Sequence, residues 1–115
     1  MSEPSLFTRI LNGEIPGDKL LETDSLFVVR DINPQAPLHV LVIPKTEQYR
    51  DVTELAAGDP GLLAEMVAAG KQIATEHANG EYRLIFNNGA SAGQSVFHVH
   101  AHVLGNIKEN KLVGF

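Results

Sequence analysis

The spacing of apolar and polar residues along the chain predicts two helices. Apolar side chains recur at three- and four-residue intervals over residues 62–78, behind Asp59, a favourable N-cap, and ahead of Gly80. A shorter helix is predicted over residues 6–12, because Ser5 can cap its first turn. We therefore expect one long and one short helix.

Five runs rich in apolar and β-branched residues are typical of strands. They occupy residues 19–22, 26–31, 39–43, 81–87 and 96–104. The predicted order is a short helix, three strands, a long helix and two strands. Short connections between neighbouring strands favour antiparallel pairing, so the predicted fold class is α+β. The length of 115 residues fits a single domain spanning residues 1–115.

The charge balance argues against a nucleic-acid polymer as a partner. The 14 acidic residues outnumber the 9 basic ones, and the basic residues form no cluster in the sequence. A single nucleotide remains compatible with this balance, because a few local donors can hold one phosphate. The chain contains no cysteine, which excludes disulfides, thiolate metal sites and cysteine nucleophiles.

No segment has the composition of a membrane span. The longest stretch without a charged side chain, residues 84–107, contains Asn, Gln, Gly and His residues and would not face lipid. The first residues are acidic and lack the apolar core of a signal peptide. We expect a soluble, cytoplasmic protein with no membrane partner.

Three histidines alternate with other residues in the last predicted strand. On a strand over residues 96–104, His98, His100 and His102 would share one face, because successive side chains point to opposite faces. His39 begins another predicted strand and could lie beside them. Three imidazoles in a row are costly to bury without partners, so this cluster is a candidate functional site.

Three interpretations of the histidine cluster are open at this point. The first is a solvent-exposed polar strand face. The second is a metal site, since three histidines can bind zinc, although no carboxylate stands nearby in the sequence as a further ligand. The third is nucleophilic catalysis, in which a neutral imidazole attacks phosphorus and a protonated one gives a proton to the leaving group.

The glycine-rich segment before the histidines favours the third interpretation. Residues 88–95 can turn backbone N–H groups and small polar side chains toward an anion. The absence of acidic residues over 84–107 also avoids electrostatic repulsion of a phosphate group.

Residues 93–105, Gly-Gln-Ser-Val-Phe-His-Val-His-Ala-His-Val-Leu-Gly, resemble the signature of the histidine triad (HIT) family, which is His-x-His-x-His followed by two apolar residues. Two upstream segments are similar to the branch called histidine triad nucleotide-binding proteins. They are Asp-Ile-Asn-Pro-Gln-Ala-Pro at residues 31–37 and Leu-Val-Ile-Pro-Lys at residues 41–45. The resemblance extends from residue 6 to residue 105.

This resemblance implies a single HIT domain with a five-stranded antiparallel meander sheet, one long helix and one short helix. Members of the branch form homodimers that join two sheets into one of ten strands. The helix over residues 62–78 would then lie near the dimer axis. The strand over residues 81–87 would pair across that axis, which removes an unpaired sheet edge.

The resemblance also implies catalytic roles for the histidines. His100 matches the nucleophile, which attacks the α-phosphorus and forms a nucleotidyl-histidine intermediate. His102 matches the residue that contacts the phosphate and assists the leaving group, a task for which we expect it to stay protonated. His98 and His39 match a supporting pair that orders the cluster.

Further residues match contacts to a bound nucleotide. Asp31 matches the carboxylate that holds the ribose hydroxyl groups. The phosphate and leaving-group contacts are matched by Asn87, Gly93, Gln94 and Ser95. The apolar walls of the base pocket, which would belong to the core in any case, are matched by Phe7, Ile10, Val29, Ile32 and Leu41.

The implied activity is that of a purine nucleoside phosphoramidase, a hydrolase acting on AMP or GMP derivatives. The alternatives are a dinucleoside polyphosphate hydrolase and a non-catalytic nucleotide-binding regulatory protein. We expect no metal or other cofactor, because Ser5 and Thr8 stand where some bacterial relatives carry a Cys-x-x-Cys zinc motif. Residues 106–115 also lack the Trp and Pro found in the C-terminal tails of many relatives.

Overall fold

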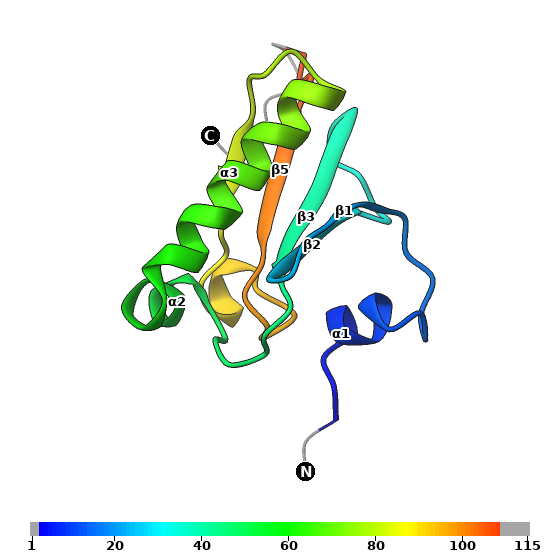
Figure 1. Ribbon diagram of the computed structural model, residues 1–115. Helices are drawn as coiled ribbons and strands as arrows, with labels where there is room; N and C mark the ends of the chain where they lie inside the picture. The colour runs from blue at the N-terminus through cyan, green and yellow to red at the C-terminus, as the bar shows by residue number, and fades with distance from the viewer. Residues whose placement is uncertain (1–2, 109–115) are drawn as a thin grey trace.

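Five antiparallel strands form a single sheet in the computed structural model, which describes residues 3–108 (Figure 1). The strands are Lys19–Glu22 (β1), Leu26–Arg30 (β2), Leu38–Pro44 (β3), Arg83–Ile85 (β4) and Ala101–Gly105 (β5). Their order across the sheet is β1-β2-β3-β5-β4, so β5 lies beside β3 and β4 forms an edge. The α+β class and the five-stranded antiparallel sheet predicted from the sequence are confirmed.

Helices cover both faces of this sheet. They are Leu6–Leu11 (α1), Val52–Gly58 (α2) and Pro60–His77 (α3), with a 3-10 turn at Ala90–Ala92 (η1). The long helix α3 runs beside β3 and β5, whereas α1 lies near the opposite side of the sheet (Figure 1). The short helix α2 was not predicted, because its few residues show no extended apolar repeat.

Side-chain caps set the beginnings of the three α-helices. Ser5, Asp51 and Asp59 each accept a hydrogen bond from a backbone N–H group three residues later. A cap of this kind typically contributes about 1 kcal/mol to helix stability. The caps at Ser5 and Asp59 are those that the sequence predicted.

The central strand β3 separates two hydrophobic cores. It is buried at every position, and alternate side chains reach opposite faces. Val40 and Val42 belong to the core beneath α3, whereas Leu41 and Ile43 belong to the core beneath α1. Each buried aliphatic side chain of this size contributes about 1.5–3 kcal/mol. The same alternation places His39 on the α1 face.

The segment before β5 differs from the prediction. The sequence predicted one strand over residues 96–104, but the strand begins only at position 101. The backbone N–H of Val99 donates to the carbonyl of Tyr49 in the loop after β3, at 3.0 Å. This segment therefore bonds to a loop instead of a neighbouring strand. The strand β4 is likewise shorter than the predicted range 81–87.

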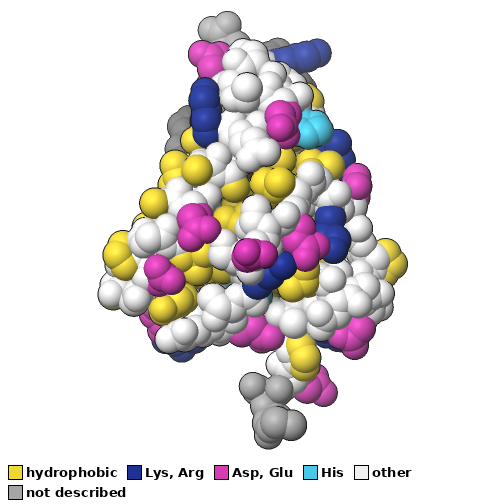
Figure 2. Space-filling view, in the orientation of Figure 1, with side chains coloured by type: hydrophobic (Ala, Val, Ile, Leu, Met, Phe, Trp, Pro, Cys, Tyr) yellow, Lys and Arg dark blue, Asp and Glu magenta, His cyan; other side chains and the backbone are white. Residues whose placement is uncertain are grey.

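The surface carries mixed charges. On the face shown in Figure 2, Lys and Arg side chains are interspersed with Asp and Glu side chains. Among residues 3–108, none of the helices combines the length and the apolar character needed to cross a lipid bilayer. Most of the C-terminal tail that the sequence analysis singled out, residues 109–115, lies outside the described residues.

Candidate active site

A cavity of about 300 Å³ opens beside α1 on the face of the sheet opposite α3. Its lining residues are Leu6, Phe7, Ile10, Val29, Arg30, Asp31, Ile32, Leu41, Asn87, Gly93, Ser95, Val96, His100 and His102. They come from α1, β2, the loop between β2 and β3, β3, β5 and the segment before β5. The fold thus brings together most of the residues that the sequence predicted for a nucleotide site.

Some lining residues differ from the prediction. The side chain of Ile32 is 95% exposed, so it stands at the rim of the cavity and does not belong to the core as expected. Leu6, Arg30 and Val96 also line the cavity, although the sequence analysis did not select them. The sequence did contain a signal for Leu6 as a lining residue, because Leu6 lies one helical turn before Ile10, which was predicted to line the pocket. No comparable signal marks the other two.

Gln94 anchors the glycine-rich loop. Its side chain is buried, and its Oε1 accepts a hydrogen bond from the N–H of Gly89 at 2.8 Å. Its Nε2 donates to the carbonyls of Arg50 and Val96, at 2.6 and 3.1 Å. Because both ends of the amide are engaged inside the protein, the expectation that Gln94 contacts the phosphate is corrected. It holds the loop that leads to Ser95.

Two glycines allow this loop to bend toward the cavity. Gly89 and Gly93 have φ angles of 101° and 99°, a region of backbone conformation that favours glycine. A Cβ atom at Gly93 would lie 3.7 Å from Nδ2 of Asn87, so this amide packs beside the loop. Asn87 and Ser95 both line the cavity, where they offer polar groups to a ligand.

Hydrogen bonds assign the protons of His39 and His102. The backbone N–H of Gln35 donates to His39 Nδ1 at 2.9 Å, so the neutral His39 ring carries its proton on Nε2. That Nε2 lies 3.0 Å from His102 Nδ1 and 3.4 Å from Asp31 Oδ2. His39 therefore donates to His102 Nδ1, and the neutral His102 ring carries its own proton on Nε2.

A hydrogen bond to the backbone also decides which ring nitrogen of His100 has a lone pair. His100 Nδ1 lies 2.9 Å from the carbonyl oxygen of His98. A carbonyl only accepts hydrogen bonds, so the proton is on Nδ1 and the lone pair is on Nε2. The ring of His100 meets Phe7 edge to face at 4.7 Å and lies 5.4 Å from the ring of His102.

His98 does not share the cavity with the other two members of the triad. Its side chain is 1% exposed, and its Nε2 donates to the carbonyl of Pro44 at 2.7 Å. Its Nδ1 is hydrogen-bonded to the hydroxyl of Ser5. Nearby, the hydroxyl of Thr8 donates to Glu47 at 2.8 Å. Ser5 and Thr8, which stand at the positions compared with a zinc motif, therefore form hydrogen bonds within the protein.

Comparison with known proteins identifies the family. A model of the HIT domain matches residues 12–109. The chain belongs to the HIT family. The purine nucleoside phosphoramidase of Escherichia coli (strain K12) is 37% identical over 107 residues, which cover 91% of this chain and 89% of that protein.

Two further relatives agree with the assignment to the HIT family. An uncharacterized HIT-like protein of Synechocystis sp. is 40% identical over 109 residues, covering 91% of this chain and 92% of that protein. The structure of a HIT family hydrolase from Clostridium thermocellum matches with a TM-score of 0.88 at 34% identity. That match covers 99% of this chain and 100% of the other. The family resemblance noted in the sequence is confirmed.

Burial makes weak bases of four histidines of this HIT protein, namely His39, His98, His100 and His102. It lowers the pKa of His39, His98 and His100 below the usual value of 6.5. Burial, helped by the neighbouring His100 and His39, lowers the pKa of His102 to about 4. Without bound substrate His102 is therefore neutral near neutral pH, and the expectation that it is protonated applies to the state with a phosphate beside it.

Three side chains of this HIT protein lie close enough to be tested as a metal site. Ligand atoms of Asp31, His39 and His102 lie within 4.8 Å of one another, so the fold supplies the carboxylate that the neighbouring sequence lacked. A metal would need a lone pair on His39 Nε2. The N–H of Gln35, donating to Nδ1, keeps the proton of the ring on Nε2. The donor set therefore fits a hydrogen-bonded cluster better than a cation.

Proposed function

We propose that this HIT protein is a purine nucleoside phosphoramidase, which hydrolyses the P–N bond of an adenosine or guanosine 5′-phosphoramidate. The observation that carries the proposal is the hydrogen bond between His100 Nδ1 and the carbonyl of His98. It leaves Nε2 of a neutral imidazole free to attack phosphorus. The relative from Escherichia coli that bears this name supports the same reaction here.

In this proposal the nucleotide occupies the cavity beside α1. The base lies against the apolar side chains Phe7, Ile10, Val29, Leu41 and Ile32. Asp31 offers a carboxylate to the ribose hydroxyl groups. The α-phosphate lies near Asn87, Gly93 and Ser95 of the loop, which places it next to His100 and His102.

In the first step, His100 Nε2 forms a bond to the α-phosphorus while the P–N bond breaks. The departing nitrogen requires a proton, because an amine anion is a very poor leaving group. The anionic phosphoryl group raises the pKa of the adjacent His102, and Asp31 Oδ2, 4.0 Å from His102 Nδ1, supports the charged ring. The added proton comes from solvent and lies on His102 Nδ1, while His39 Nε2 donates to Asp31 Oδ2, 3.4 Å away, instead. The imidazolium then passes its Nε2 proton to the amine and becomes neutral, with its remaining proton on Nδ1.

In the second step, water attacks the phosphorus of the nucleotidyl-histidine. Neutral His102 accepts a proton from this water, the bond to His100 Nε2 breaks, and the nucleoside monophosphate leaves. The proton on His100 Nδ1 stays hydrogen-bonded to the carbonyl of His98 throughout, which stabilises the positive charge on the nucleotidylated ring. No metal or other cofactor takes part in this scheme.

A substrate panel tests the proposal. Adenosine and guanosine 5′-phosphoramidates and a dinucleoside polyphosphate are assayed with and without EDTA. We expect the phosphoramidates to be hydrolysed fastest, and chelation to leave their rate unchanged. Faster turnover of the dinucleoside polyphosphate would favour that alternative activity, and binding without turnover of any substrate would favour a regulatory protein.

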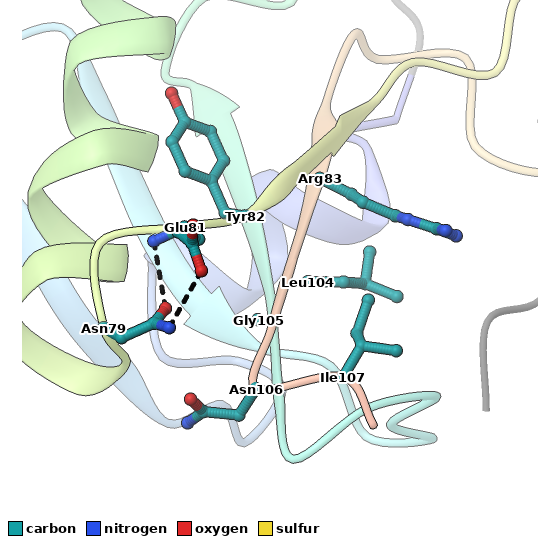
Figure 3. A pocket seen from close by; sticks show the side chains of 8 residues that line it. All are labelled: Asn79, Glu81, Tyr82, Arg83, Leu104, Gly105, Asn106 and Ile107. Atoms are coloured by element: carbon teal, nitrogen blue, oxygen red, sulfur yellow. Dashed lines mark hydrogen bonds between the residues drawn. The ribbon is translucent and has the colours of Figure 1, made fainter. Parts of the chain in front are cut away.

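We also propose that the protein acts as a homodimer joined at β4. This strand forms a sheet edge beside a cavity of about 240 Å³, drawn in Figure 3. The side chains of Arg83 in β4, Leu104 in β5 and Ile107 just after β5 project to the same side (Figure 3). Pairing with a second β4 would satisfy edge backbone groups and cover these side chains.

A further inference from the structure

The hydroxyl of Ser5 contacts a histidine that the chain places 93 residues later. Because His98 Nε2 donates to the carbonyl of Pro44, the neutral ring has its lone pair on Nδ1. The Ser5 hydroxyl therefore donates its single proton to His98 Nδ1. Its oxygen also accepts the N–H of Thr8 at 3.1 Å as the N-cap of α1. One hydroxyl thus both begins the helix and fixes the orientation of a buried ring.

The backbone carbonyl of His98 connects this residue to His100, whose Nε2 is the proposed reacting nitrogen. The carbonyl of His98 accepts the Nδ1 proton of His100, which keeps the lone pair on Nε2. This segment lies outside the sheet, so a strand ladder does not hold the carbonyl in place. The N–H of Val99, in the same peptide unit, donates to the carbonyl of Tyr49, and the two hydrogen bonds of the buried His98 ring, to Ser5 and Pro44, restrain this residue further.

The N-terminal end of α1 is itself attached to the loop after β3. Glu47 accepts hydrogen bonds from the backbone N–H of Ser5 at 3.0 Å and from the hydroxyl of Thr8 at 2.8 Å. A helix as short as α1 does not hold its conformation alone, so such attachments fix its place. The Glu47 carboxylate therefore keeps the Ser5 hydroxyl beside His98.

We propose that Ser5 is a positioning residue of the active site, whose hydroxyl fixes the His98 ring and thereby holds the His98 carbonyl where it orients His100. This inference rests on the function proposed above for the reacting role of His100. It gives a part in catalysis, without a metal, to the residue that stands where some relatives carry a cysteine of a zinc motif. Ser5 itself does not line the cavity, so its effect is on the rate of reaction more than on nucleotide affinity.

Substitutions at Ser5 can separate the helix cap from the contact with His98. Ser5→Gly removes the hydroxyl but costs the cap only a few tenths of a kcal/mol, because glycine is tolerated at N-caps. Ser5→Thr keeps both the cap and the donor. Asp59→Ala removes the equivalent cap of α3, away from the cavity, and serves as the control for a general loss of stability.

The first measurement is ¹⁵N–¹H NMR of the histidine rings in the free protein, which reports which nitrogen carries the proton. In the wild type and in Ser5→Thr we expect His100 to carry its proton on Nδ1. In Ser5→Gly we expect a mixture of the two ring tautomers at His100. Wild-type ring signals of His100 in Ser5→Gly would overturn the proposal.

The second measurement separates kcat from KM for an adenosine 5′-phosphoramidate. For Ser5→Gly we expect kcat to fall by about fivefold to tenfold, as for the loss of one hydrogen bond, with KM within about twofold. Ser5→Thr and Asp59→Ala should keep the wild-type kcat. An equal loss of kcat in Asp59→Ala would show a merely structural effect and contradict the proposal. If the wild type hydrolyses no phosphoramidate while the NMR change occurs, the positioning role stands and only the proposed function fails.

Discussion

At the scale of single residues, the position of each imidazole proton decides what the site can do. A backbone N–H from Gln35 and a backbone carbonyl from His98 set opposite tautomers on His39 and His100. As a result, His100 presents a lone pair on Nε2 and His102 presents an Nε2 proton. The two rings lie 5.4 Å apart and line one cavity, as the proposed roles of nucleophile and proton donor require.

The first prediction concerns the nucleophile. His100→Asn should lower turnover by at least about a thousandfold, because it removes the group proposed to form the covalent intermediate. Affinity for AMP, measured by calorimetry, should remain within about threefold, because it depends on Asp31 and the apolar wall. His77→Asn, the same change at an exposed histidine of α3, is the matched control.

Rapid quenching followed by mass spectrometry should reveal the nucleotidyl adduct on His100 of the wild type. An adduct on another residue, or near-normal turnover in His100→Asn, would show that the nucleophile is wrongly assigned.

The second prediction concerns the ribose contact. Asp31 Oδ1 accepts the N–H of Asn33 at 2.8 Å, and an asparagine could keep this turn while losing the charge. Asp31→Asn should therefore weaken AMP binding by about 1.5–3 kcal/mol and change the affinity for 2′,3′-dideoxy-AMP much less. Asp24→Asn at an exposed turn is the control. Equal losses for both ligands would remove Asp31 from this role.

The third prediction follows from the lowered pKa values. The pKa of His102 is about 4 in the folded protein and near 6.5 in the unfolded chain, so between these values the unfolded chain binds more protons. The free energy of unfolding should therefore fall as the pH falls from 6.5 toward 4. The lowered pKa values of the other buried histidines act in the same direction.

Urea denaturation at about pH 7 and about pH 5 measures this dependence. His102→Gln should reduce the difference in unfolding free energy between the two pH values, whereas His77→Gln should leave it unchanged. A wild-type protein that is more stable at the lower pH would contradict the assignment of neutral, buried histidines.

At the scale of structural elements, the loop before β5 and the helix α1 enclose the site from two sides. The loop is fixed from within by Gln94, and α1 is fixed at its start by Ser5 and Glu47. Both elements are short and lie outside the sheet. Strands and long helices are held by regular backbone hydrogen bonds, whereas side-chain hydrogen bonds hold these two elements in place. Polar residues that do not line the cavity, namely Ser5, Glu47 and Gln94, therefore hold these two elements beside it.

The fourth prediction tests the loop anchor. Gln94→Leu keeps the side-chain volume but leaves the Gly89 N–H and the Arg50 carbonyl without their partner. The free energy of unfolding should fall by about 1–3 kcal/mol, and kcat/KM should fall because Ser95 and Gly93 are no longer held beside the phosphate. Gln72→Leu, exposed on α3, is the control. Wild-type kcat/KM in Gln94→Leu would show that the loop keeps its shape without this anchor.

At the scale of the whole molecule, β4 lies at one edge of the sheet formed by residues 3–108. The strand is short and all three of its residues are only partly buried. The other edge strand of the sheet is β1. On this strand Lys19 and Glu22 form an ion pair at 2.8 Å. Charged side chains at an edge resist pairing. The strand β1 carries two of them, whereas β4 carries one, Arg83, beside the apolar Leu84 and Ile85, so β4 resists pairing less.

The fifth prediction is that two copies associate through β4. Sedimentation equilibrium at micromolar concentration should give twice the chain mass of 12.5 kDa. Pairing of the two edges should also protect the backbone amides of β4 from hydrogen exchange, since they would then be bonded between copies. A species of 12.5 kDa at that concentration would rule out the dimer.

The sequence by itself determined the features that depend on local spacing. The caps at Ser5 and Asp59, the helix α3 and the antiparallel sheet follow from residue type and periodicity within short windows. The His-x-His-x-His spacing likewise indicated the family and a functional cluster. Spacing on an ideal strand also placed all three rings on one face, and Phe7 of α1 does contact both His98 and His100. The spacing did not show that His98 is buried and does not line the cavity.

Only the tertiary structure decided which groups meet across the chain. His39 and His102 are 63 residues apart, and Ser5 and His98 are 93 residues apart, yet each pair is joined by a hydrogen bond. Whether an imidazole is a nucleophile, a donor or a buried anchor depends on the single partner that each nitrogen finds. Those partners include backbone groups, which every residue carries and no residue type identifies. For that reason the sequence could identify the histidines but not the position of their protons.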